Sequence, residues 1–154
     1  MVLSLLLLFF EMALMVFLIG ISVHDIRQHI IKNNVLLWML PFAAGRAVVN
    51  SIIAISGGAV WYHPILSHIG GAIFAFLLFL IVAMIFGGIG GGDIKLTAVL
   101  GLAAGLTGIL VSLVVASLAA AGYGAFQMYV RKKPKVSLAF VPFLLTGYIV
   151  SLLI

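Results

Sequence analysis

Long apolar runs alternate with short polar stretches along the whole chain. The first run covers Met1 to Ser22, the second Val35 to Ile55, and the third His68 to Phe86. Each run is near or above the roughly 18 residues that an apolar helix needs to cross a bilayer. The runs also lack the alternation of polar and apolar residues that is typical of barrel strands. Membrane-spanning helices are therefore the predicted elements.

The next apolar stretch is too long for one span. As a single helix, Ile94 to Val130 would measure roughly 55 Å, whereas the hydrocarbon core is about 30 Å thick. The stretch must fold back, and the glycines between Gly105 and Gly108 favour a reversal there. This predicts a short fourth span from Ile94 to Leu106, a fifth that ends at Arg131 to Lys135, and a sixth from Val136 to Ile154.

The prediction is an all-α, polytopic membrane helix bundle of about six transmembrane helices, forming one domain over residues 1–154. The connections between these spans differ in charge. Every Lys and Arg except Arg46 lies near the connections after the first, third and fifth spans, whereas Gly57 to Ser67 and Gly105 to Gly108 contain none. Cytoplasmic loops are enriched in Lys and Arg. We therefore expect the basic connections to be cytoplasmic and both termini to be outside.

Composition narrows the function classes. The chain is 66% hydrophobic, 7% charged and free of cysteine, which excludes disulfides, thiolate metal sites and a thiol nucleophile. The net charge of +5 fits topology signals better than nucleic-acid binding, because no soluble basic domain is present. The histidine pairs His24/His29 and His63/His68 fall on opposite sides of the predicted membrane. We expect a lipid bilayer partner, no nucleic acid, no metal and no cofactor, and the oligomeric state stays open.

Three carboxylates occur in the chain: Glu11, Asp25 and Asp93. Asp25 follows the first span and Asp93 precedes the fourth, so the topology places both at the cytoplasmic boundary. The shortness of the fourth span recesses Asp93 toward membrane level. Ionisable groups near lipid are costly and commonly functional. Considered alone, however, Asp25 could be a solvated or capping residue in a loop.

Two carboxylates that share one proton can hydrolyse a peptide bond without a metal. The ionised member activates water, and the protonated member polarises the carbonyl group. Glycines in the segment Gly87 to Gly92 would let an extended substrate backbone approach Asp93 closely. A glycine cluster is also a common flexible turn. Phosphate binding is disfavoured, because no Lys-Ser or Lys-Thr follows Gly92.

Two motifs surround these aspartates. Residues 90–96 read Gly-Gly-Gly-Asp-Ile-Lys-Leu and match the pattern Gly-x-Gly-Asp-x-Lys-Leu. Asp25, Arg27, Ile31 and Asn33 match Asp-x-Arg-x-x-x-Ile-Pro-Asn, with Lys32 at the usual proline. In both motifs the chain resembles the type IV prepilin peptidases, which are membrane aspartic proteases. It is similar to their short form, which serves tight-adherence (Flp-type) pili and lacks the N-terminal cysteine zinc segment linked to N-methylation.

The resemblance implies that Asp25 and Asp93 are the catalytic pair. It also implies that Gly90 and Gly92 shape the site or bind substrate, and that Lys95 either orients Asp93 or marks the cytoplasmic interface. The substrate would be a prepilin or pseudopilin, in which a basic leader precedes an apolar helix. Cleavage would follow a glycine at the cytoplasmic face of the inner membrane.

Two other function classes stay open. A small proton-coupled carrier also uses intramembrane carboxylates, but both aspartates lie toward one face and no chain of acids crosses the midplane. A structural subunit of a pilus or secretion assembly would tolerate neutral substitutions at Asp25 and Asp93. Cleavage assays on Asp→Asn variants separate these classes from a protease.

Further features concern packing inside the bundle. Glu11 and Arg46 lie about equally deep in the first two spans, and an intramembrane charge normally needs a partner, so we expect them to pair. In the alternative, Glu11 faces the site and tunes it. Gly101 and Gly105 form a small-xxx-small pair, which predicts a close helix contact.

Overall fold

The computed structural model describes residues 2–28, 31–86, 90–129 and 139–154. Within these ranges the chain is helical and contains no strand, which confirms the all-α class. The helices are α1 (Val2–Gln28), α2 (Asn33–Ser56), α3 (Tyr62–Phe86), α4 (Gly91–Tyr129) and α5 (Val141–Leu153). The first four are long and apolar enough to cross a membrane, and α5 is a shorter apolar helix.

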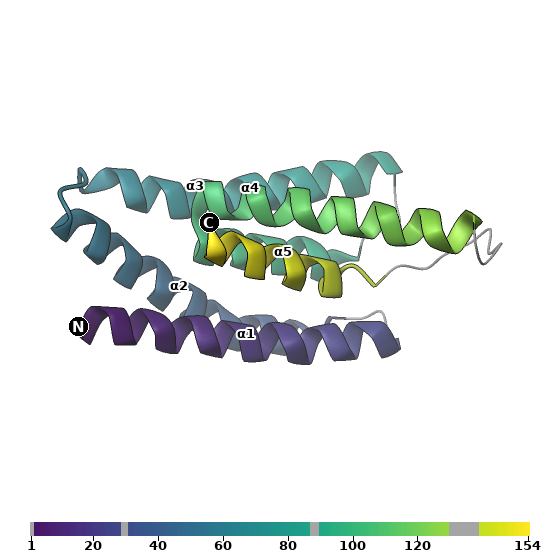
Figure 1. Ribbon diagram of the computed structural model, residues 1–154, viewed down its shortest axis with the longest axis horizontal. Helices are drawn as coiled ribbons and strands as arrows, with labels where there is room; N and C mark the ends of the chain where they lie inside the picture. The colour runs from purple at the N-terminus through teal and green to yellow at the C-terminus, as the bar shows by residue number, and fades with distance from the viewer. Residues whose placement is uncertain (1, 29–30, 87–89, 130–138) are drawn as a thin grey trace.

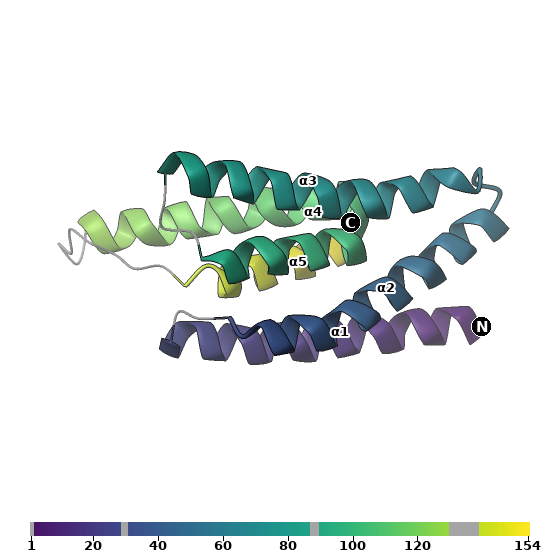
Figure 2. The ribbon, with the colours of Figure 1, turned by 180° about the vertical axis from the view of Figure 1, so that it is seen from behind.

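Helix α4 consists of two arms that meet at Gly105. Residues 91–104 and 106–129 are helical, but Gly105 has φ 73° and ψ 177°. Glycine adopts this positive φ without a steric penalty. The two arms run in opposite directions, as Figures 1 and 2 show from both sides. The predicted reversal is confirmed, but it occurs at Gly105 itself, and the first arm begins at Gly91 rather than at Ile94.

The end of α1 differs from the prediction. The helix continues to Gln28, whereas the sequence predicted an end at Ser22. Residues 23–28 contain neither Gly nor Pro, so nothing in this polar stretch interrupts the helical backbone hydrogen bonds. As a result, Asp25 lies inside a helix and not in a loop.

Two other helix starts also differ. Helix α3 begins at Tyr62 rather than His68, with Pro64 in its first turn, where the missing N–H costs no hydrogen bond. Helix α5 begins at Val141 rather than Val136, again with a proline in its first turn. Residues 130–138, which include the basic cluster that was predicted to end the fifth span, lie outside the described ranges.

The helices form an antiparallel bundle. Helix α4 packs most extensively against α3 and α5, and α5 also contacts α1. Both termini lie toward the same end of the bundle, together with the turn between α2 and α3 and the reversal at Gly105 (Figures 1 and 2). The C-terminal end of α1 and the N-terminal end of α4 lie at the opposite end, so Asp25 and Asp93 share that end.

A backbone-to-backbone contact joins α3 to the first arm of α4. A Cβ atom on Gly71 would lie 2.6 Å from the carbonyl oxygen of Gly101 and 2.7 Å from the carbonyl carbon of Gly105. Small residues permit such close approach between membrane helices. The contact predicted for Gly101 and Gly105 is confirmed, and its partner Gly71 was missed.

The outer surface of the bundle is strongly apolar. Exposed side chains on α1 and α3 are large hydrocarbons, including Leu5, Phe9, Val16, Ile73 and Ile81. A water-soluble protein rarely exposes so wide an apolar surface. Together with the four span-length helices, this surface indicates a multi-pass membrane protein.

An ion pair lies between α1 and α2. The guanidinium of Arg46 donates to Glu11 Oε1 at 3.1 Å, and the two side chains are 10% and 24% exposed respectively. A second guanidinium nitrogen donates to the carbonyl oxygen of Ala103, close to the reversal. The predicted pairing of Glu11 with Arg46 is therefore confirmed, and Arg46 has an additional backbone partner.

Two side chains of α3 also satisfy backbone groups that the reversal leaves outside regular helix. His68 Nδ1 donates to the carbonyl oxygen of Leu102 at 2.9 Å, which leaves Nε2 to accept from the Asn50 amide at 3.2 Å. Ser67 Oγ accepts from the Leu106 N–H at 3.2 Å. Backbone groups inside a membrane need such internal partners. Polar side chains of α2 and α3 thus stabilise the turn in α4.

Candidate active site

Asp25 lies in the last two turns of α1. The buried residues Leu14, Leu18, Ile21 and Asp25 recur at helical spacing, so the core-facing stripe of α1 ends in a carboxylate. Asp25 is 5% exposed, and its Oδ2 accepts a hydrogen bond from the N–H of Val141 at 3.3 Å. Asp25 is therefore not solvated, and it caps the first turn of α5 from a distant part of the sequence.

Asp93 lies in the first turn of α4. Its backbone N–H donates to the carbonyl oxygen of Gly90 at 3.0 Å, and its own carbonyl oxygen accepts from Thr97 Oγ1 at 3.0 Å. These bonds fix the backbone that carries the carboxylate. Among the described residues, its Oδ1 is buried and has no hydrogen-bond partner. A buried oxygen without a partner is costly unless a ligand or water binds it.

The two aspartates come from helices far apart in the sequence and approach each other at one end of the bundle. Asp25 lies close enough to Asp93 for the charges of the two side chains to interact. The convergence that topology predicted is therefore present, although both residues are on helices rather than in loops.

The two sequence motifs dock on each other next to these aspartates. A Cβ atom on Gly92 would lie only 2.7 Å from the Cβ of Ile31, so glycine is needed where α4 begins beside the segment that leads into α2. Lys95 Nζ donates to Asn33 Oδ1 at 3.1 Å. Two contacts thus hold the start of α4 against the start of α2, and in each contact one residue comes from each motif.

These contacts change the expectations for the glycines and for Lys95. The space beside Gly92 is filled by the chain's own Ile31, so it is not open to a substrate backbone. Lys95 directs its ammonium group to Asn33 and not to Asp93. A Cβ on Gly90 would lie 3.5 Å from Asp93 Oδ2, so a side chain there would touch the carboxylate. The glycines at 87–89 lie outside the described residues.

Lys32 stands where the second motif usually has proline. It precedes α2 with φ −74° and ψ 128°, and the Val35 N–H donates to its carbonyl oxygen at 3.1 Å. Proline fixes φ near −65°, so lysine here holds the conformation that proline would impose. The backbone at position 32 is therefore compatible with proline.

Among the described residues, the histidines do not form a cluster. His63 is exposed and stacks on Tyr62, His68 is buried at the reversal, and His29 lies outside the described residues. Among the described residues, no group of three His, Cys, Asp or Glu side chains converges. The structural role of His68 was not predicted from the sequence, although a histidine at the start of an apolar run was the available signal.

Comparison with known proteins gives one matching family and one similar protein. A model of the type IV leader peptidase family matches residues 12–125, a range that contains both aspartates. The chain is 33% identical over 137 residues to a Bacillus subtilis (strain 168) protein named prepilin leader peptidase/N-methyltransferase. The alignment covers 88% of this chain and 52% of that protein, so the chain spans about half the length of this relative. No solved structure gave a significant match.

Proposed function

We propose that this chain, which belongs to the type IV leader peptidase family, is a membrane-embedded aspartic endopeptidase. Its substrates would be prepilins or pseudopilins, from which it removes the short basic leader. The observation that carries the proposal is the approach of Asp25 and Asp93 from separate helices at one end of the bundle. The relative's name also includes an N-methyltransferase activity, and the proposal is confined to cleavage.

In the proposed mechanism the two aspartates share one proton. The ionised carboxylate takes a proton from water as the water oxygen bonds to the scissile carbonyl carbon. The protonated carboxylate gives its proton to the carbonyl oxygen. Collapse of the tetrahedral intermediate breaks the C–N bond. The leaving nitrogen receives a proton from the pair, and a hydroxyl group of the intermediate returns its proton to the pair, which again holds one proton. The buried Oδ1 of Asp93 supports this role, because its hydrogen-bonding capacity is unused among the described residues.

The orientation belongs to the same proposal. Six helical segments, with α4 counted as two, would cross or enter the inner membrane with both termini outside. The aspartates would then face the cytoplasm. Arg27, Lys32 and Lys95 support this orientation, since all three are exposed near the end that holds the aspartates. The first arm of α4 is about 20 Å long, so Asp93 would be recessed below the membrane surface.

The neighbours of the pair have positioning roles in this proposal. Gly90 keeps one side of the Asp93 carboxylate free of a side chain, so an extended substrate can approach it. Gly92 lets Ile31 approach α4, and Lys95 ties α4 to Asn33. These contacts would hold Asp93 at a fixed distance from Asp25.

Coexpression with prepilins tests the function. The chain is expressed with candidate prepilins, and the product's N-terminus is read by mass spectrometry. Leader removal by the wild-type protein, with none by Asp93→Asn protein at equal abundance, is the expected result. Cleavage that persists with Asp93→Asn would assign the activity to another protease and contradict the proposal.

A further inference from the structure

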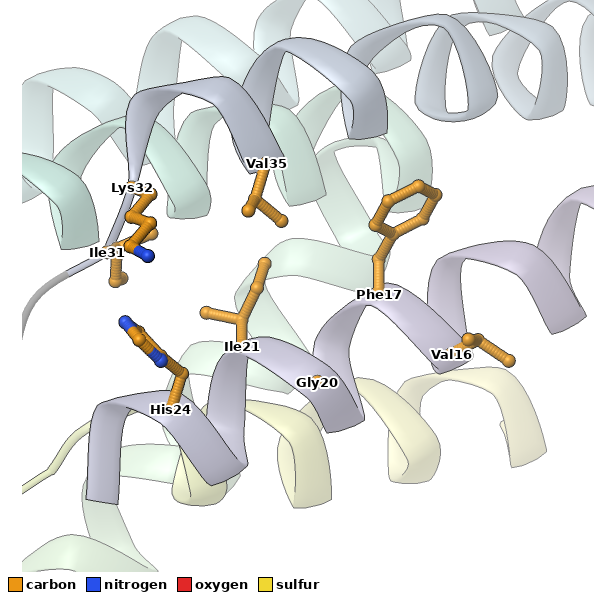
Figure 3. A pocket seen from close by; sticks show the side chains of 8 residues that line it. All are labelled: Val16, Phe17, Gly20, Ile21, His24, Ile31, Lys32 and Val35. Carbon is orange, nitrogen blue, oxygen red and sulfur yellow. The ribbon is translucent and has the colours of Figure 1, made fainter. Parts of the chain in front are cut away.

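A groove runs along α1 beside the candidate active site. It lies between α1 and the segment that leads into α2, and its volume is about 310 Å³. Figure 3 shows its lining: apolar side chains line most of the groove, and the nitrogen-bearing side chains of His24 and Lys32 lie at one end. Its lining includes Phe17, Gly20, Ile21, His24, Ile31 and Lys32.

The nitrogen-bearing end of the groove adjoins both halves of the aspartate pair. His24 immediately precedes Asp25 on α1. Ile31, on the opposite wall, is the residue that packs against Gly92, next to Asp93. A segment lying in the groove would therefore leave it at the position where the two carboxylates meet. This continuity links the groove to a chain that is being cleaved.

The same end has unused hydrogen-bonding capacity. Among the described residues, His24 Nε2 is buried without a hydrogen-bond partner, and Figure 3 shows its ring pointing toward Ile31 and Lys32. Both His24 and Lys32 can donate to an acceptor. A peptide must be non-helical at its scissile bond, so its carbonyl groups there lack helical partners. The donors and these carbonyl acceptors are complementary.

The apolar length of the groove suits a helix. Gly20 is exposed in the middle of the α1 wall, and a Cβ atom there would meet nothing within 4 Å. A glycine on a membrane helix lets a second helix approach its backbone closely. Phe17 and Ile21 flank this position and provide apolar contacts.

We propose that this groove receives the substrate's apolar helix immediately after the scissile bond. His24 and Lys32 bind the backbone carbonyls of the first non-helical residues, and the helix packs over Gly20. This assignment rests on the proposed function and makes the groove the substrate-positioning surface of the same site.

Filling the groove tests the helix contact. The variant Gly20→Leu places a side chain over the middle of the groove, at a position where a Cβ atom meets nothing within 4 Å. It should raise KM for a membrane-inserted prepilin about tenfold or more. Gly122→Leu is the matched control, because Gly122 is also an exposed helical glycine with nothing within 4 Å, and it should leave KM unchanged. Equal KM values for the two variants would overturn the groove assignment.

The polar end is tested separately. His24→Leu removes the ring donor and should raise KM, whereas His24→Gln keeps an amide donor and should recover much of the loss. An equal effect of both variants, or an effect on protein abundance alone, would overturn the binding role of His24.

Crosslinking identifies the occupant even if a substitution disturbs folding. A photo-crosslinking amino acid replaces Val16, a groove residue, or Leu118, an exposed residue of α4, in Asp93→Asn protein that retains uncleaved substrate. We expect prepilin adducts from position 16 and none from position 118. Adducts from position 16 to phospholipid only would overturn the proposal. Failure of wild-type protein to cleave any prepilin would instead refute the proposed function itself.

Discussion

Neutralising Glu11 should destabilise the bundle through Arg46. Removing one partner of a buried ion pair costs about 3–5 kcal/mol, because the remaining charge is left without compensation. Here Glu11 is 24% exposed and Arg46 keeps its bond to the Ala103 carbonyl. The cost of Glu11→Gln should therefore be smaller, about 1–3 kcal/mol. Arg46→Gln loses both partners and should approach the full cost of about 3–5 kcal/mol.

The measurement is the free energy of unfolding in mixed detergent, titrated with a denaturing detergent. The double variant Glu11→Gln with Arg46→Gln should lose less unfolding free energy than the two single variants lose together. The difference, which is the coupling energy, should be at least about 1 kcal/mol. Arg46→Lys separates the two contacts, because a single ammonium can pair with Glu11 but does not reproduce the fork that also reaches Ala103. Additive losses would refute the pairing argument. Normal stability with lost cleavage in Glu11→Gln would favour the alternative in which Glu11 tunes the site.

Three further predictions concern packing, the turn and topology. Gly101→Ala should cost about 1–3 kcal/mol in thermal unfolding, because its Cβ would meet a backbone carbonyl of α3, whereas Gly122→Ala should be neutral or stabilising. Lys32→Pro should stabilise the protein by about 0.4–1 kcal/mol, since φ is already −74°, and a lower melting temperature would contradict the proline-compatible turn. A reporter inserted at residues 57–61 should lie outside the cell membrane, and one fused after Tyr129 should lie in the cytoplasm. The reverse pattern would contradict the proposed orientation.

The sequence predicted the reversal and the meeting of the aspartates for simple geometric reasons. An apolar stretch from Ile94 onward exceeds one membrane thickness, so it must turn, and glycine is the residue that permits a positive φ. Counting spans then places Asp25 and Asp93 at the same end. Neither inference needs a side-chain contact, and both depend only on length and on the order of the runs.

The contacts that fix the site were not predictable in the same way. Nothing in the local pattern indicates that Ile31 packs on Gly92 or that Arg46 reaches Ala103, because these contacts arise only when helices dock. The end of α1 also differs from the prediction, because the polar composition around Asp25 predicts a loop whereas the helix continues to Gln28. A polar face at a helix end has the same composition as a connection, and only tertiary packing distinguishes them.

The most direct test of the central claim compares Asp25→Asn, Asp93→Asn and the double variant as purified proteins. Asparagine preserves size and hydrogen-bonding capacity, so all three should retain their melting temperature. Each single change should lower the rate of leader cleavage by at least about 10³-fold, and the double variant should be no slower than either one, because the two carboxylates act as a unit. Substantial cleavage by either single variant, at normal stability, would contradict the account.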